Sequence, residues 1–386
     1  MLGFIIIGFA LILGFIRGGS FPQVLSYFVQ ALTDPATLQL LGVITLIEML
    51  TIFLELTGSL NRILAALRKV IDDPRALIAL VPSFMGVFPV PGGAMLSAPM
   101  VKIYGEEIGF DADHKSSANL FFRHVWDLVI PFKPHIILAA SVANMPLFNL
   151  IGWHLPVSIA TLFVGYWLLV GRYPKTEITH VTLPDEVKPT LPLWIEVAPL
   201  ALPLIISLGF GISFSYSMAI GLLFGLITQK ASKPMMKRMV REGIRPKLLL
   251  LLASVMIFKT VLENTDVVKI VGATFTTYGI SLEILVFALP LAVSALTGLE
   301  VVGVGVLFPL LLGMIPEGRP ALPYLIVMMT ANSAGQLISP AHICMVAGNE
   351  YFGASLGRVV RMNLLPQVFR LVAAAIFAWV MYLFRF

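Results

Sequence analysis

The stretch PSFMGVFPVPGGAMLSAP, residues 82–99, decides the fold because it is apolar enough to lie at membrane depth yet cannot form one straight helix. Its centre carries Pro89, Pro91, Gly92 and Gly93; proline removes a backbone donor, and glycine tolerates positive φ. Inside a bilayer, broken backbone is tolerated only where protein buries it or where it lines a cavity. The stretch therefore predicts a re-entrant hairpin with a Pro-Gly tip, and a bent structural helix is the alternative interpretation.

The composition is typical of a polytopic membrane protein. Of the 386 residues, 58% are hydrophobic and only 12% are charged, whereas soluble domains carry about 25% charged residues. The apolar N-terminus lacks a basic region and a small-residue cleavage site, which predicts a retained span rather than a signal peptide. The single cysteine, Cys344, excludes internal disulfides and predicts no cysteine-based metal site. We expect no nucleic-acid partner, because most basic residues flank the apolar segments.

Ten apolar segments are predicted to span the membrane, and two more, 77–100 and 282–314, are predicted to form hairpins. Two mildly amphipathic segments, 59–70 and 265–279, are predicted to lie at the membrane surface. The predicted spans are 2–16, 20–33 (the shortest), 37–57, 117–143, 147–170, 193–210, 213–229, 247–263, 320–347 and 363–384.

The two halves of the chain repeat one order of landmarks. Glu55 in its Leu-Glu-x-Thr context corresponds to Glu263, which lies 208 residues further along. Gly92 aligns with Gly303, which predicts a longer tip for the second hairpin. Internal repeats of this kind are found in many secondary transporters. The predicted division is a first repeat over 1–170, a cytoplasmic linker over 171–192 and a second repeat over 193–386.

Positive charge predicts that the two repeats have opposite orientations in the membrane. If the basic loop 230–247 is cytoplasmic, alternating spans place most of the 26 basic residues, including Arg17, on the cytoplasmic side, whereas Lys269 falls outside. The first hairpin then enters from the cytoplasm and the second from the opposite face. This threading predicts a multi-pass protein of the plasma membrane with both termini outside.

The predicted site lies where the hairpin tips meet two proline-interrupted spans, FFRHVWDLVIPFKPHI (121–136) and TANSAGQLISPAHI (330–343). Half-helix N-termini attract anions, and the carbonyl groups freed at a break suit cations. Asp127 and Glu300 are candidates for coupling to Na⁺ or H⁺, because a charge at membrane depth is costly. The residues predicted to bind the solute are Pro91, Gly92, Gly93, Arg123, Lys133, Thr297, Gly298, Asn332, Ser333, Gln336, Ser339 and His342.

Structural explanations stay open for several of these residues. Arg123 and Asp127 are four positions apart and could neutralise each other, and the Lys133 side chain could reach the membrane surface. His135 and His342 could relay protons or could pack in the core. The sequence contains no zinc-protease, Walker or nucleophile-elbow motif, so we expect no enzyme, no catalytic residue, no metal and no cofactor.

Four stretches resemble an uncharacterised integral-membrane family, the domain-of-unknown-function family four hundred and one. They are LTDPATLQLL (32–41), LELTGSLNRI (54–63), PSFMGVFPVPGGAMLSAPMV (82–101) and FFRHVWDLVIPFKP (121–134). That family is grouped with the ion transporter superfamily of gluconate permeases, citrate and dicarboxylate symporters, and related antiporters. The resemblance implies a scaffold domain that dimerises and a mobile domain that holds both hairpins and moves like an elevator. The Ser-Asn-Thr tips of dicarboxylate members are missing here, so neither their substrate nor their sodium coupling carries over.

The predicted fold class is an all-α polytopic membrane protein with two inverted-topology repeats, each holding a re-entrant hairpin and a broken transmembrane helix. The predicted function is ion-coupled secondary transport, as a symporter, of a small carboxylate-type organic anion. The expected partners are the anionic solute, membrane lipid and a second copy of the chain. A cation/proton antiporter and an intramembrane enzyme are the competing hypotheses.

Overall fold

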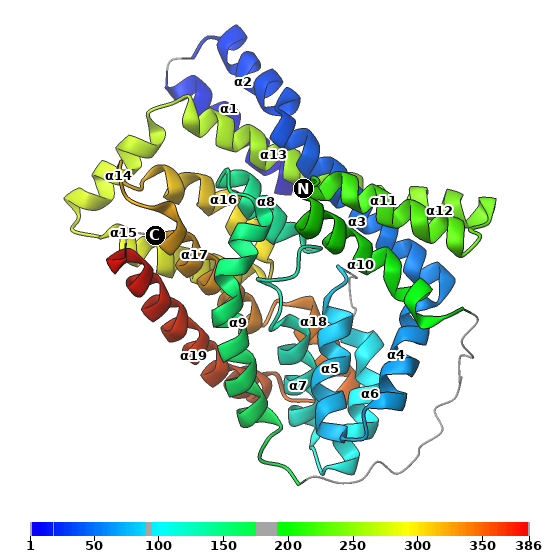
Figure 1. Ribbon diagram of the computed structural model, residues 1–386. Helices are drawn as coiled ribbons and strands as arrows, with labels where there is room; N and C mark the ends of the chain where they lie inside the picture. The colour runs from blue at the N-terminus through cyan, green and yellow to red at the C-terminus, as the bar shows by residue number, and fades with distance from the viewer. Residues whose placement is uncertain (1, 18, 90–93, 175–190, 385–386) are drawn as a thin grey trace.

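The computed structural model describes residues 2–17, 19–89, 94–174 and 191–384, and this part of the chain contains nineteen α-helices and no strand (Figure 1). The prediction of an all-helical polytopic fold is therefore confirmed. Pro91, Gly92 and Gly93 of the predicted first tip lie outside the described residues, as does most of the predicted linker 171–192.

The helix order of the second half repeats that of the first. In each half a long apolar helix is followed by a short helix, a pair of helices, an interrupted helix and a long closing helix. The first half contains α1 (Leu2–Ile16), α2 (Phe21–Thr33), α3 (Pro35–Thr57), α4 (Ser59–Val70), α5 (Pro74–Gly86), α6 (Ala94–Glu107), α7 (Ala112–His124), α8 (Pro134–Val142) and α9 (Leu147–Leu169). The second half contains α10 (Leu193–Phe210), α11 (Phe214–Thr228), α12 (Lys233–Gly243), α13 (Pro246–Glu263), α14 (Val267–Thr277), α15 (Leu282–Thr297), α16 (Glu300–Gly313), α17 (Ala321–Leu337), α18 (Ile343–Phe352) and α19 (Leu356–Leu383).

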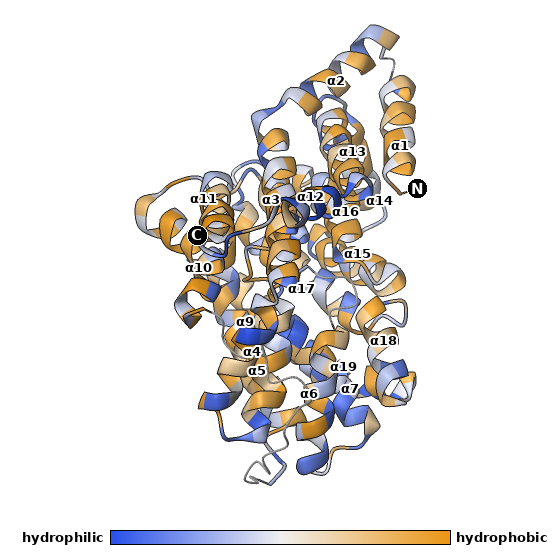
Figure 2. Cartoon of the chain, turned by 90° about the vertical axis from the view of Figure 1, so that its right-hand side faces the viewer, coloured by the Kyte–Doolittle hydropathy of each residue, from blue (hydrophilic) through white to orange (hydrophobic). Residues whose placement is uncertain are grey.

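Helix length and hydropathy identify the helices that can cross a bilayer. Within the described residues α3, α9, α10 and α19 are long and apolar enough, and α13 with α14 qualifies as a pair bent by 75°. Hydrophobic residues predominate along the long helices in Figure 2, whereas α12 is strongly polar. Helix α5 has 13 residues and α15 has 16, which correspond to about 20–24 Å, less than the ~30 Å hydrocarbon core. The paired helices are therefore too short to cross it singly.

Residues 82–99 do not form one continuous helix. Helix α5 ends at Gly86 and α6 begins at Ala94, so the chain is broken where the prolines and glycines predicted a break. Asp73 caps the start of α5 by accepting a hydrogen bond from the Arg75 backbone N–H, and Pro74 occupies the first helical position, which suits its fixed φ.

The second helix pair turns more tightly than the sequence alignment predicted. Only Gly298 and Leu299 separate α15 from α16, and Gly298 has a φ of 69°, a conformation that glycine adopts without a Cβ penalty. The prediction of a longer second tip is wrong. Gly303 lies inside α16 instead, where a Cβ would overlap the Asn332 side chain.

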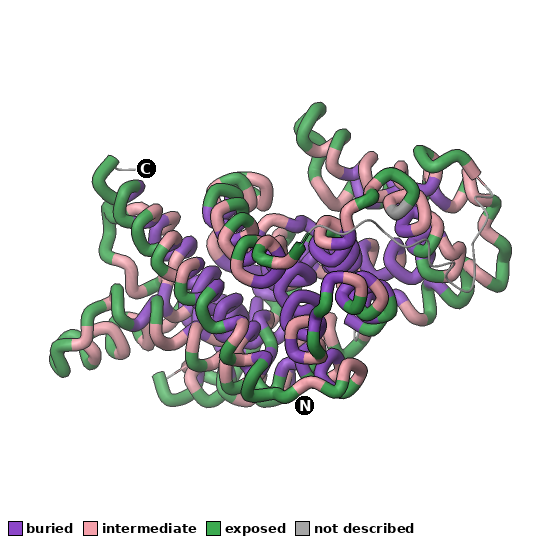
Figure 3. The backbone as a smooth tube through the Cα atoms, turned by 90° about the horizontal axis from the view of Figure 1, so that it is seen from below, coloured by how far each residue is buried: buried purple, intermediate pink, exposed green. Residues whose placement is uncertain are grey.

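The buried residues form one core along the middle of the molecule, whereas the peripheral helices are largely exposed (Figure 3). Helices α7 and α17 are buried on nearly every side, including their polar positions. A helix that is buried on all sides lies at the centre of a bundle. The interrupted helices are therefore the inner elements of this fold.

A buried ion pair fastens the amphipathic helix α4 to α10. The Arg62 guanidinium lies 2.6 Å from the Glu196 carboxylate, which is 1% exposed. Ser59 donates a second hydrogen bond to the same carboxylate at 2.5 Å and also lies 3.1 Å from Gln229. These contacts join the start of α4 to the start of α10 and the end of α11.

The first helix runs parallel to α13, which changes the predicted topology. A Cβ at Gly3 would contact Leu250 near the start of α13, and Arg17 at the end of α1 lies 3.9 Å from Asp266 beyond the end of α13. Lys269 pairs with the same Asp266 at 3.3 Å. The prediction that Arg17 and Lys269 lie on opposite sides of the membrane is therefore wrong. It failed because 20–33, here α2, was counted as a span.

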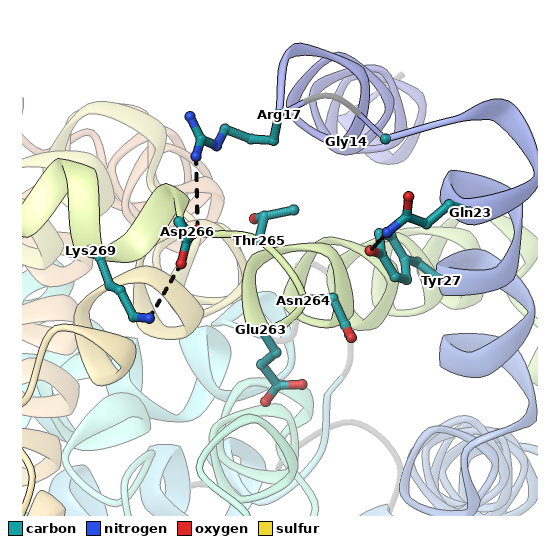
Figure 4. Close-up of a pocket in the computed structure, with 10 residues that line it drawn as sticks. Gly14, Arg17, Gln23, Tyr27, Glu263, Asn264, Thr265, Asp266 and Lys269 are labelled. Carbon is teal, nitrogen blue, oxygen red and sulfur yellow. Dashed lines mark hydrogen bonds and ion pairs between the residues drawn. The ribbon is translucent and has the colours of Figure 1, made fainter.

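Arg17, Asp266 and Lys269 line a polar pocket of about 350 Å³ at the bend between α13 and α14 (Figure 4). Gln23 and Tyr27 of α2 close its other side and hydrogen-bond to each other at 2.9 Å. The pocket is open and its ion pairs are solvated, which makes each of them weak.

Arg62→Ala is expected to lower the melting temperature of the detergent-solubilised protein strongly, because it leaves the buried Glu196 carboxylate without its cation. Breaking such a pair costs about 3–5 kcal/mol. The matched control is Arg238→Ala, which removes an arginine from the exposed Arg238–Glu242 pair on α12. Equal melting temperatures for the two variants would contradict a stabilising role for the Arg62–Glu196 pair.

Single cysteines at Arg17 and Lys269, introduced into a Cys344→Ala background, are expected to react with a membrane-impermeant maleimide from the same side. A cysteine at Lys237 on α12 is expected to react from the other side. Labelling in sealed vesicles of known orientation measures this. Labelling of the Arg17 position together with the Lys237 position would show that α1 does not run parallel to α13.

Candidate functional site

The two interrupted helices have wide breaks, as their prolines predicted. Helix α7 ends at His124 and α8 begins at Pro134, while α17 ends at Leu337 and α18 begins at Ile343. Pro134 occupies the first position of α8, where its missing N–H costs no hydrogen bond. Both breaks are lined by buried polar side chains, and these side chains form the candidate site.

Equivalent asparagines fasten the second helix of each pair. Asn119 of α7 donates to the carbonyl oxygen of Ala94, the first residue of α6, at 3.0 Å. Asn332 of α17 donates to the carbonyl oxygen of Glu300, the first residue of α16, also at 3.0 Å. The two asparagines are 213 residues apart. The two halves therefore make the same contact with equivalent side chains.

A second equivalent pair lies one helical turn further on. Arg123 donates from Nη1 to the carbonyl oxygen of Met85 near the end of α5, at 2.8 Å. Gln336 donates from Nε2 to the carbonyl oxygen of Gly298 at the end of α15, at 3.4 Å. Arg123, Asn332 and Gln336 were predicted to bind the solute, and the structure places their polar groups on the helix pairs. These residues contact the ends of the paired helices.

Asp127 lies in the first break between the side chains of His124 and Lys133. Its Oδ2 is 2.6 Å from His124 Nδ1, and its Oδ1 is 3.0 Å from Lys133 Nζ. All three side chains are at most 9% exposed. The carboxylate partners of Asp127 are thus His124 and Lys133, whereas the Arg123 side chain reaches Met85. Lys133 points inward to Asp127, so its charge does not extend to the membrane surface.

Glu300 of the second half pairs with His135 of the first half. His135 Nδ1 lies 2.8 Å from the Glu300 carboxylate, and its Nε2 lies 3.1 Å from the carbonyl oxygen of Asp127. Both partners of the His135 ring are oxygen acceptors. Each ring nitrogen is therefore placed to donate a hydrogen bond, as in an imidazolium. His135 thus contacts the carboxylate of Glu300 and the backbone carbonyl of Asp127, the two residues that were predicted to couple ions.

Arg370 of α19 brings a further cation into this centre. Its guanidinium is fully buried, and Nη1 donates to Ser333 Oγ at 3.0 Å. Nε and Nη2 have no hydrogen-bond partner within the described residues. Glu300 and Asp127 lie within electrostatic range of this guanidinium. A buried arginine with two unsatisfied donors is costly unless an acceptor fills the space beside it.

The remaining predicted residues have local partners. Thr297 hydrogen-bonds to the carbonyl oxygen of Val293 in its own helix at 2.7 Å, and Ser339 accepts from the Ala341 N–H at 3.2 Å. His342 lies 3.1 Å from the Gly298 carbonyl oxygen and 3.2 Å from the His124 ring. Of these residues, only His342 faces the charged centre.

Arg370, His124 and Cys344 belong to the centre but were absent from the predicted site, and His135 was considered only as a proton relay or a core residue. The Cys344 side chain lies beside the imidazoles of His124 and His342. An arginine inside an apolar span was a usable signal for Arg370. His124 and Cys344 are 220 positions apart, and only the packing of α18 on α7 brings them together.

A cavity of about 440 Å³ lies along α8, between α3, α9, α10 and α11. Its lining includes Ser141 and Asn144 at the end of α8 and Ser213 at the start of α11. Helix α8 has nine residues, about 13 Å, and its first turn carries His135 of the charged centre. One short helix thus lines the cavity and carries His135 of the charged centre.

These features define a polytopic helical fold with an enclosed charged centre between two halves, and such a fold is known among transporters. The structure is similar to the crystal structure of the Alcanivorax borkumensis YdaH transporter, whose topology is described as unusual. The TM-score is 0.62 over 92% of this chain and 87% of that chain, at 10% sequence identity. A family model described as "Protein of unknown function (DUF401)" matches residues 2–384, and the chain belongs to this family. No curated protein matches the sequence.

Gly335→Ala is expected to destabilise the protein, because a Cβ there would overlap the carbonyl oxygen of Leu291 in α15. Overpacking of this kind costs about 1–3 kcal/mol. The control is Gly357→Ala in α19, where a Cβ meets nothing within 4 Å. Thermal unfolding measures both variants, and an unchanged melting temperature for Gly335→Ala would contradict the close packing of α15 on α17.

Proposed function

We propose that the protein is a secondary active transporter for a small organic anion of the carboxylate type. The observation that carries this proposal is the Arg370 guanidinium, which is fully buried and keeps Nε and Nη2 without a partner among the described residues. A carboxylate accepts two parallel N–H bonds from such a fork, and the low dielectric of the interior strengthens them. Lys133 supplies a second buried cation next to the same centre.

The coupling ion that fits this centre best is a proton. His135 and Glu300 form a buried acid–imidazole pair at 2.8 Å, and a carboxylate and an imidazole in contact can exchange a proton. With His135 protonated, three cations (His135, Lys133 and Arg370) face the carboxylates of Asp127 and Glu300. The excess positive charge favours an anion, and deprotonation removes that excess. Proton and anion would then move together.

The proposed movement is an elevator-like displacement of the hairpin-bearing helices against the outer helices. Support comes from contacts that join the two broken helices into one unit. Ser116 of α7 donates to Asn349 of α18 at 2.6 Å, and Asp113 accepts from the Ser355 N–H at 2.7 Å. The short helix pairs are fastened to this unit by Asn119 and Asn332. On this proposal both pairs are re-entrant and the repeats are inverted.

In the proposed plasma-membrane topology the basic helix α12 is cytoplasmic. Because α1 runs parallel to α13, the N-terminus then lies in the cytoplasm and the C-terminus outside. Helix α2 lies along the outer surface, as α12 does along the inner one. Exposed apolar side chains along α1, α10 and α11 face lipid or, in the proposed homodimer, a second copy.

The function is tested by a thermal-shift screen of organic acids, followed by uptake of each stabilising acid into proteoliposomes. An inward proton gradient is expected to drive uptake, and Arg370→Gln is expected to weaken binding at least about tenfold, the loss of one charged hydrogen-bond pair. The control is Arg319→Gln, an arginine on the exposed α16–α17 connection. Arg370→Lys keeps the charge if the glutamine variant does not fold.

Two results would contradict the proposal. Proton flux driven by an opposing cation gradient without organic solute would identify an antiporter. Chemical change of the acid without its passage across a sealed vesicle would identify an enzyme.

Glu300→Gln is expected to remove the dependence of uptake on the proton gradient, and an unchanged dependence would exclude the His135–Glu300 pair as the coupling element.

A further inference from the structure

Beside the charged centre, three side chains that can ligate a metal converge from the two halves of the chain. His124 ends α7, His342 immediately precedes α18, and Cys344 is the second residue of α18. One ligand atom from each lies within 4.8 Å of the other two. The Arg370 site does not use these atoms, because the His124 and His342 rings meet each other through their Nε2 atoms at 3.2 Å.

The hydrogen bonds of the two imidazoles show which atoms are available for a ligand. His124 Nδ1 faces the Asp127 carboxylate at 2.6 Å, and His342 Nδ1 faces the Gly298 carbonyl oxygen at 3.1 Å. Both partners are acceptors, so both Nδ1 atoms carry hydrogen. In the neutral rings both Nε2 atoms then present lone pairs to each other. Two lone pairs at 3.2 Å repel, so a cation belongs between them.

The surroundings are those of a metal site. Histidine ligands usually donate their other ring N–H to a carboxylate or a backbone carbonyl, which are the partners of His124 and His342 here. Two nitrogens bound at 2.0–2.1 Å to a tetrahedral zinc ion are about 3.3 Å apart, close to the observed 3.2 Å. A bridging proton would need only the two nitrogens, whereas the sulfur of Cys344 supplies a third, softer ligand at the same point.

We propose that His124, His342 and Cys344 bind one zinc-class transition-metal ion. Two imidazoles and one thiolate favour Zn²⁺ over Mg²⁺ and Ca²⁺, which prefer oxygen. Three protein ligands leave a fourth position open to water or another small ligand. Binding releases the thiol proton of Cys344 and any proton shared by the two Nε2 atoms. The ion joins α7 to α18 and, through His342, to the Gly298 end of α15. The inference does not depend on the transported solute.

The site is tested on the purified full-length protein by metal content after dialysis and by competition with a chromophoric zinc indicator. About one equivalent of Zn²⁺ is expected. His342→Gln and Cys344→Ser are each expected to weaken binding at least about tenfold. The control is His114→Gln, which removes a partly exposed histidine that pairs with Asp111. Binding at background level, or binding that survives both ligand variants, would overturn the proposal.

A measurement without substitutions covers the case in which the variants do not fold. Cys344 is the only cysteine, so a maleimide reports on this thiol alone. Zn²⁺ is expected to slow its modification at least about tenfold, since the metal-bound thiolate is withdrawn from reaction, while Mg²⁺ has no effect. Equal rates with and without Zn²⁺ would show that a proton alone occupies the space between the two histidines.

Discussion

Backbone carbonyl groups at membrane depth have no water to bind. This fold therefore depends on the side chains that hydrogen-bond to the carbonyl groups where its helices end. Four side chains of the interrupted helices reach the ends of the paired helices: Asn119, Arg123, Asn332 and Gln336. They stand at equivalent positions, two in each half. The same side chains that satisfy the broken backbone therefore also join the paired helices to the interrupted helices that end at the charged centre.

The charged centre follows from that arrangement. Because α7 ends inside the protein, the segment that follows it places Asp127, Lys133 and His135 beside Glu300 at the start of α16. Each charge is paired across a short distance, as burial requires. Arg370 is the exception, because its guanidinium keeps two donors without a partner in the described part of the chain. That imbalance distinguishes a binding site from a purely structural network.

Helix positions were predictable from the sequence, and the partners of individual side chains were not. Apolar runs bounded by proline, glycine and charge placed α3, α9 and α10 within about two residues of their observed ends, because lipid permits few alternatives to a helix. The strongly polar α12 was predicted as a loop. Counting α2 as a span separated Arg17 from Lys269, which the structure places at the same Asp266, since charge bias alone does not distinguish a short helix from a span.

Within the site, the sequence indicated Asp127 and Glu300 because carboxylates are rare in apolar segments. It did not indicate that Arg123 and Gln336 would contact the helix pairs, which depends on contacts between segments about forty residues apart. It also could not show that His124 and Cys344 lie side by side.

A map of the protein in lipid nanodiscs with a stabilising organic acid tests the central claim most directly. The account predicts solute density within hydrogen-bond distance of the Arg370 guanidinium, between α8, α16 and α17. Solute density elsewhere, with Arg370 bound to a protein carboxylate, would contradict it.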